Sequence, residues 1–159
     1  MTCALPKMLS VLCLTVALQA QAPGQLPGAK GKQMERIGTP PAGVEIAEVY
    51  LYVTGARPKA GTPRPQRFPS GTTKLNLDID LKSEPPEAAT FDCEVSTASG
   101  KVALADGYMG YMAVPAKQVF SLTYPVEAKS GKFADGAYRL KLLVNGRAVV
   151  ALNWSIGTQ

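Results

Sequence analysis

The strongest constraint on the fold is a strict alternation of apolar and polar residues in TKLNLDIDLK, residues 73–82. Successive side chains of a strand point to opposite faces, so this pattern predicts a β-strand with one buried and one solvated face. We expect Asn76, Asp78 and Asp80 to lie in solvent. A calcium site is disfavoured there, because residues on one strand face are ~6.6 Å apart and diverge, whereas calcium needs its oxygen ligands within ~2.6 Å.

Weaker strand-like runs occupy much of the remaining sequence, separated by clusters of Gly, Pro, Asp and Asn. No segment shows a convincing helical period of 3.6 residues. Turn signals every 8 to 12 residues between short strands are typical of an antiparallel β-sandwich, here of about seven strands. The weaker runs are residues 44–54, 89–97, 101–105 and 117–125.

The last two strands flank Asn145-Gly146, a strong signal for a hairpin turn. A two-residue loop would pair Leu142 with Val149 and place the large apolar residues of the two strands on opposite faces. A one-residue shift reverses every side chain. We therefore expect a three-residue loop, residues 144–146, which pairs Leu142 with Ala148 and puts Gly146 in a left-handed bulge position.

Three segments together resemble a known family: RFPSGTTKLNLDIDLK, TFDCEVSTASGKVALA and FADGAYRLKLLVNGRAVVALNWSI. They are similar to the immunoglobulin-like modules of exported bacterial proteins over residues 44–157. The most specific part is the final hairpin, although phenylalanine is commoner at the position of Trp154 and the usual tryptophan of the central strand is missing. The resemblance implies an immunoglobulin-like β-sandwich, and it carries over no active site.

The N-terminus has the features of a signal peptide. Lys7 precedes an apolar run, residues 8–18, and Ala20-Gln21-Ala22 fits the small-x-small cleavage pattern. An uncleaved anchor is the alternative. We expect export to the periplasm or the cell exterior, with no transmembrane helix after cleavage. The expected organisation is a signal peptide at 1–22, a Pro/Gly-rich linker at 23–43 and the sandwich domain at 44–159.

The composition excludes several chemistries. The chain has no histidine, which removes Ser-His-Asp and Cys-His catalysis and imidazole zinc sites, and it has no phosphate-binding glycine motif. After signal cleavage Cys93 is the remaining cysteine, and its alternation with charged neighbours predicts a core position. Parity predicts the same for Trp154. We expect no cofactor, no metal and no enzymatic activity.

The first candidate interaction segment is the proline-rich loop GARPKAGTPRPQRFPSG, residues 55–71. It carries four basic residues that a polyproline II conformation would display to solvent: Arg57, Lys59, Arg64 and Arg67. They would suit an anionic envelope polymer or a protein partner. The alternative is an ordinary inter-strand loop that its charges keep soluble.

The second candidate is ADGYMGYMAVP, residues 105–115, which lies between two expected strands. Its aromatic residues, Tyr108 and Tyr111, could stack on a sugar or a peptide. Its thioethers, Met109 and Met112, could hold Cu(I), although two thioethers without histidine make a poor site. The structural alternative is that the segment covers one edge or end of the sandwich.

Three functions remain open. The sequence favours a non-enzymatic binding or interaction module of the cell envelope, whose partner is a protein or an anionic polymer. A structural envelope component without a ligand is the second, and an enzyme or metal carrier the third. The formal net charge of +5 is mild, and the basic residues are not interleaved with aromatics, so nucleic-acid binding is not expected.

Overall fold

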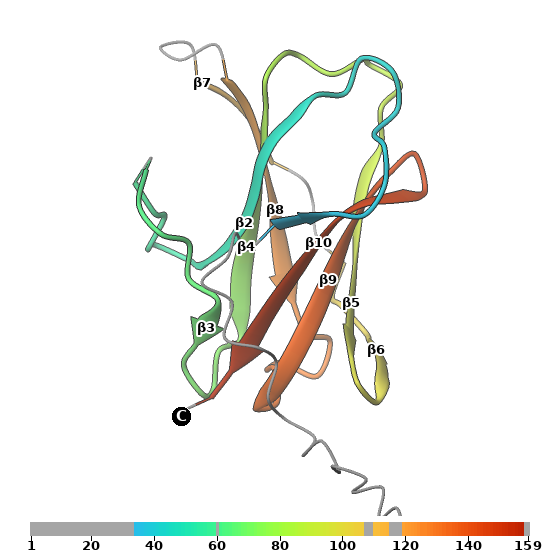
Figure 1. Ribbon diagram of the computed structural model, residues 1–159. Coiled ribbons are helices and arrows are strands. Elements are labelled where there is room, and N and C mark those ends of the chain that lie inside the picture. The colour runs from blue at the N-terminus through green and yellow to red at the C-terminus, as the bar shows by residue number, and fades with distance from the viewer. Residues whose placement is uncertain (1–33, 60, 107–109, 115–118, 158–159) are drawn as a thin grey trace, which may run out of the picture.

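A computed structural model describes residues 34–59, 61–106, 110–114 and 119–157. In these ranges the backbone forms ten strands and no helix, as the alternating pattern predicts. The strands form two sheets that pack face to face, which confirms the all-β sandwich class (Figure 1). Within the described ranges no helix is long and apolar enough to cross a membrane.

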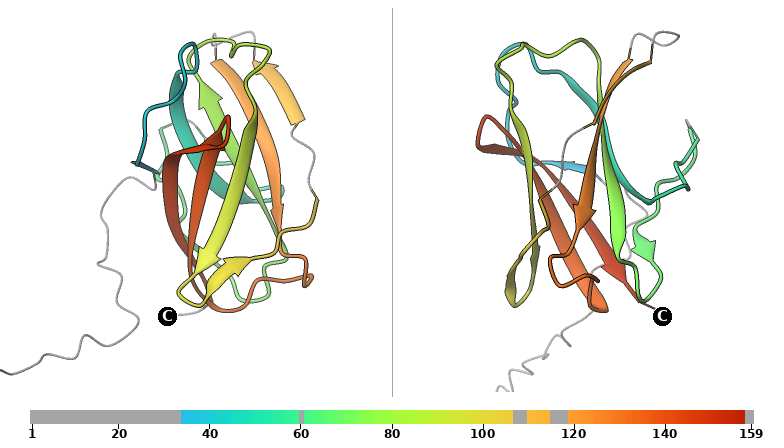
Figure 2. Two further views of the ribbon diagram at one scale, coloured as in Figure 1. Left: turned by 90° about the vertical axis from the view of Figure 1, so that its right-hand side faces the viewer. Right: turned by 180° about the vertical axis from the view of Figure 1, so that it is seen from behind.

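The larger sheet has the strand order β1-β10-β9-β5-β6. Its pairs are antiparallel, with one exception: the short strand β3 runs parallel to β10. Both β1 and β3 pair with the same edge of β10, β3 at the end of that strand and β1 closer to its start. Figure 2 (left) looks onto this sheet. Its strands are β1 (Met34–Arg36), β3 (Arg67–Phe68), β5 (Phe91–Thr97), β6 (Gly100–Val102), β9 (Gly136–Val144) and β10 (Arg147–Ile156).

The smaller sheet has the order β2-β4-β8-β7, and all its pairs are antiparallel. Its strands are β2 (Ile46–Val53), β4 (Lys74–Leu81), β7 (Gly110–Val114) and β8 (Val119–Glu127). The strand expected at residues 73–82 is therefore confirmed as β4. The connection from β4 to β5 crosses between the two sheets at the upper end of the sandwich in Figure 1.

The core fills the space between the sheets with the inward-facing residues of both. At one end the indole of Trp154, 2% exposed, lies at the centre of an aromatic cluster. Its ring centroid is 4.4 Å from that of Tyr138, 5.2 Å from Phe133 and 5.9 Å from Phe68. Such pairs add about 1 kcal/mol each beyond the burial of their area. The expected core positions of Trp154 and Cys93 are both confirmed.

The three-residue loop expected for the last hairpin is wrong. Val144 pairs with Arg147, so the loop is Asn145-Gly146, and both residues have positive φ, 49° and 73°. This is the two-residue hairpin geometry that Asn-Gly favours. The extra residue needed to bring the apolar residues to one face is a β-bulge in β10, between Ala148 and Val150, after which Val150 pairs with Leu142.

The bulge has a partner from the start of the domain. The carbonyl oxygen of Val149 accepts hydrogen bonds from the backbone N–H groups of Ile37 (3.0 Å) and Gly38 (3.2 Å). The chain thus pairs with β10 from β1 onward, in a region where the sequence predicts a linker extending to residue 43. Among the described residues, strand pairing begins with β1 at Met34.

Candidate functional site

The outer face of the smaller sheet carries a polar cluster that the sequence did not predict. We expected Asp78 to lie in solvent, but its side chain is 0% exposed, so that expectation is wrong. Its Oδ1 accepts hydrogen bonds from the hydroxyls of Tyr52 (3.1 Å) and Thr123 (2.7 Å). Its Oδ2 accepts one from the Tyr50 hydroxyl (3.1 Å) and lies 2.8 Å from Arg57 Nε.

The cause of this burial is the loop that follows β2, which folds back over the sheet. Arg57, four residues beyond the end of β2, extends its guanidinium across β4 to β8, where Nη2 donates to Ser121 Oγ (2.9 Å). Ser121 Oγ in turn donates to Asp80 Oδ1 (2.8 Å). A buried carboxylate needs such compensation, because burying a charge without partners costs several kcal/mol.

Arg64 fixes the other end of the same loop. Its Nε and Nη2 donate to the two carboxylate oxygens of Glu48 on β2, at 2.7 and 2.6 Å, in the bidentate geometry that suits a guanidinium. The guanidinium carbon also lies 4.0 Å from the centroid of the Tyr50 ring, a cation–π contact. Two of the four basic residues in the proline-rich loop are therefore engaged within the protein itself.

Ionisation in this outer-face cluster follows from its burial. Burial raises the pKa of Tyr50 to about 12; the hydrogen bond from Arg57 acts in the opposite direction, and repulsion from the carboxylates Asp78 and Asp80 adds to the increase. Burial also raises the pKa of Tyr52, with Asp78 adding to the effect. The pKa of Asp80 is raised by burial and by repulsion from Asp78, against the stabilising hydrogen bond from Ser121. Both tyrosines thus remain protonated donors at neutral pH.

We call this arrangement the clamp: the side chains of Arg57 and Arg64 with the partners that hold them, which are Glu48, Tyr50, Tyr52, Asp78, Asp80, Ser121 and Thr123. Each oxygen of Asp78 already has two donors, which leaves it no free position for a ligand, and the described residues contain no group of three or more metal-binding side chains. What the cluster does is tie Arg57 and Arg64, one on each side of the loop after β2, to the outer face of the smaller sheet.

Of the other sequence-predicted candidates, Lys59 and Arg67 contribute no side chain to the clamp as the described residues show it. Lys59 is exposed in the loop, and Arg67 is exposed on β3. Tyr108 and Met109 lie outside the described residues. Tyr111 and Met112 are in β7, where the register pairs them with Leu122 and Ser121 of β8.

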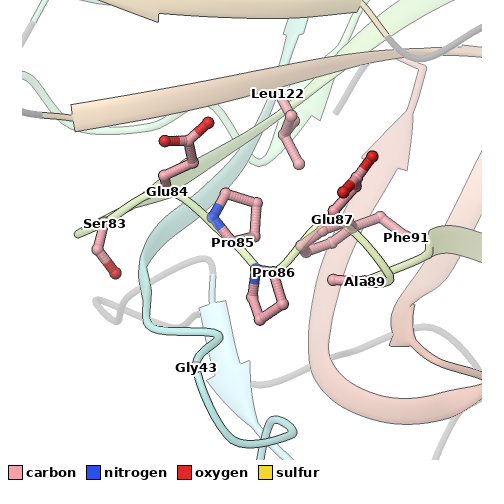
Figure 3. A pocket seen from close by; sticks show the side chains of 9 residues that line it. All are labelled: Gly43, Ser83, Glu84, Pro85, Pro86, Glu87, Ala89, Phe91 and Leu122. Atoms are coloured by element: carbon pink, nitrogen blue, oxygen red, sulfur yellow. The ribbon is translucent and has the colours of Figure 1, made fainter.

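A second candidate site is a pocket of about 910 Å³ beneath the β4–β5 connection (Figure 3). Leu122 of β8 and Phe91, the first residue of β5, contribute apolar surface from the two sheets, and Gly43 borders the pocket from the loop before β2. The connection itself supplies the remaining lining: Ser83, Glu84, Pro85, Pro86, Glu87 and Ala89. We call this the β4–β5 pocket.

The charge at this pocket is purely acidic. Figure 3 shows the carboxylates of Glu84 and Glu87 on either side of the two prolines. Neither has an ion-pair partner within the described part of the chain, whereas Glu35, Glu48 and Glu94 all pair with a basic side chain. The sequence held one signal for this: residues 83–94, SEPPEAATFDCE, contain four acids and no base.

Comparison of the sequence with protein-family models and curated proteins identifies no relative. The site must therefore be interpreted from its own geometry.

Proposed function

We propose that the protein is an exported, non-enzymatic interaction module of the bacterial cell envelope, in the periplasm or outside the cell. The observation that carries the proposal is the β4–β5 pocket, which combines apolar lining with two carboxylates that have no ion-pair partner among the described residues. Pockets of 300–1,000 Å³ with mostly apolar lining and a few polar groups are typical of binding sites. The leader-like residues 1–22 support export.

We further propose that the sandwich is an immunoglobulin-like module. The strand orders β2-β4-β8-β7 and β10-β9-β5-β6 match the arrangement of the two sheets in immunoglobulin domains, with β1 and β3 added beyond β10. The hydroxyl of Tyr138, near the start of β9, donates to the carbonyl oxygen of Ala134 (2.6 Å), which is similar to the tyrosine corner of that fold. Loops at the ends of such sandwiches commonly carry binding sites.

The geometry favours a protein partner over an anionic polymer. Arg57 and Arg64 form ion pairs with the carboxylates of Asp78 and Glu48. The other two basic residues of that loop, Lys59 and Arg67, are exposed to solvent. The pocket, in contrast, would repel an anionic polymer. A structural envelope component without a ligand is the alternative, and it predicts that altering the pocket changes no association.

The test is retention of purified residues 23–159 on washed envelope fractions of the producing bacterium. The Glu84→Gln/Glu87→Gln variant alters the pocket. Glu94→Gln/Glu127→Gln is the matched control, because it makes the same change of charge at two surface ion pairs outside the pocket. We expect retention of the wild type and the control, and loss in the pocket variant. Absence of retention for all three proteins would contradict the proposed function.

A further inference from the structure

We propose that the β4–β5 pocket binds an extended segment of a partner protein in which Lys or Arg residues flank a large apolar side chain. This inference rests on the proposed interaction function and specifies the chemistry of the partner.

The apolar part of the pocket accounts for the central side chain of that segment. Leu122 is 4% exposed and belongs to the core, so the pocket reaches the interior between the sheets. Phe91 and the rings of Pro85 and Pro86 surround the approach to it (Figure 3). A leucine or phenylalanine entering here would leave water for contact with carbon on several sides, which is favourable in proportion to the area buried.

The two glutamates account for the flanking basic residues. Glu84 and Glu87 are exposed, and they stand on either side of the proline pair. One neighbouring base, Lys82, lies 3.5 Å from the carboxylate of Glu45 and is thus already paired. Because the chain as a whole carries a net charge of +5, an acidic opening is a local reversal of sign that selects a cationic partner and disfavours anionic ones.

The pocket is held in shape before any partner arrives. At one end of the connection the Lys82 N–H donates to the carbonyl oxygen of Glu45 (2.9 Å). At the other end the Thr90 N–H donates to Asn145 Oδ1 (2.8 Å), and the Asn145 N–H donates to the Thr90 carbonyl oxygen (2.9 Å). Between these ends the Ala89 N–H donates to the carbonyl oxygen of Pro86 (2.8 Å) and forms a turn. The rings of Pro85 and Pro86 fix the φ angles of these two residues. A preformed loop loses less entropy on binding.

Gly43 adds a steric condition. A Cβ atom at this position would lie 2.9 Å from Cγ of Pro86, and φ is +81°, a conformation that residues with a side chain rarely adopt. The loop before β2 therefore packs directly against the proline wall of the pocket, because no side chain intervenes.

The experiment uses a short fluorescein-labelled peptide that alternates lysine with leucine and phenylalanine, titrated with residues 23–159 and followed by anisotropy. Two control peptides replace the lysines with glutamate or the apolar residues with serine. The protein variants are Glu84→Gln/Glu87→Gln and the matched Glu94→Gln/Glu127→Gln. We expect the pocket variant to weaken binding about fivefold, and the matched control to leave it unchanged. Both control peptides should bind more weakly than the parent peptide.

Amide chemical shifts locate the site independently of any substitution. On addition of the peptide, the backbone signals of Ser83, Glu87, Phe91 and Leu122 should move, whereas those of Glu94 and Glu127 should not. Equal weakening in both variants, shifts that avoid the pocket, tighter binding of the glutamate peptide, or no binding at all would each overturn the inference. If the peptide fails but the pocket variant still loses envelope retention, the proposed function stands with a different ligand.

Discussion

Replacing Asp78 with asparagine should destabilise the fold by about 3 kcal/mol. The amide keeps the shape of the side chain and one acceptor oxygen, but its NH₂ group replaces an oxygen that accepts from two donors. Two of the four donors around Asp78 lose their acceptor. Each unsatisfied buried donor costs about 1–3 kcal/mol. The loss is less than for a fully buried ion pair, because the side chain of Arg57 is 38% exposed and water can reach its charge.

The matched control is Asp80→Asn, two residues along the same strand face. The amide oxygen there can still accept from Ser121, and the substitution removes a carboxylate whose pKa is raised by burial and by repulsion from Asp78. We therefore expect a change within about 0.5 kcal/mol in the free energy of unfolding at neutral pH.

Urea denaturation at 25 °C, followed by circular dichroism, measures both variants against the wild type. A loss below about 1 kcal/mol for Asp78→Asn, or a larger loss for Asp80→Asn than for Asp78→Asn, would refute the account of the clamp. Repeating the measurement over pH adds a check of sign. The folded-state pKa of Asp80 is above its unfolded value of about 3.8, so its ionisation opposes folding. Relative to Asp80→Asn, the wild type should lose stability as the pH rises from this value through the folded pKa.

Three further predictions concern single residues. Burial raises the pKa of Cys93 to about 12, with Asp92 contributing, so its thiol should react with a thiol reagent at neutral pH only after unfolding; rapid labelling of the native protein would contradict its core position. Tyr138→Phe removes the hydrogen bond to Ala134 and should cost about 1 kcal/mol in urea denaturation, with unchanged aromatic packing in the near-ultraviolet circular dichroism spectrum. Gly146→Ala, at φ +73°, should cost about 1–2 kcal/mol, and a neutral result would argue against the two-residue turn.

The sequence was most informative where a single strand determined the outcome. The alternation in residues 73–82 can be interpreted without knowing the neighbouring strands, and β4 is found there. The alternation within their own strands likewise placed Cys93 and Trp154 in the core. The register of the last hairpin was different, because the bulge at Val149 pairs with the N–H groups of Ile37 and Gly38, more than a hundred residues away in the sequence. Periodicity shows that one extra residue is needed but not where it lies.

The candidate sites were predicted less well, for a related reason. Alternation assigned Asp78 to the outer face, which is correct, but it contains no information on what covers that face. Arg57 and Arg64 were selected as basic residues of interest, and their carboxylate partners lie on β2 and β4, across a loop whose path the sequence does not show. The β4–β5 pocket draws its lining from three segments far apart in the chain.

The position of β10 has a consequence for how the protein is made. This strand is the last in the described chain, yet it pairs with β1, β3 and β9 and supplies Trp154 to the aromatic cluster. During synthesis β1, β3 and β9 therefore cannot pair with β10 until Ile156 has left the ribosome. Since contacts between distant residues slow folding, the emerging chain should remain loosely structured for longer than one built from local contacts. That delay fits the export proposed above, because an exported polypeptide can cross a membrane more readily before it has folded.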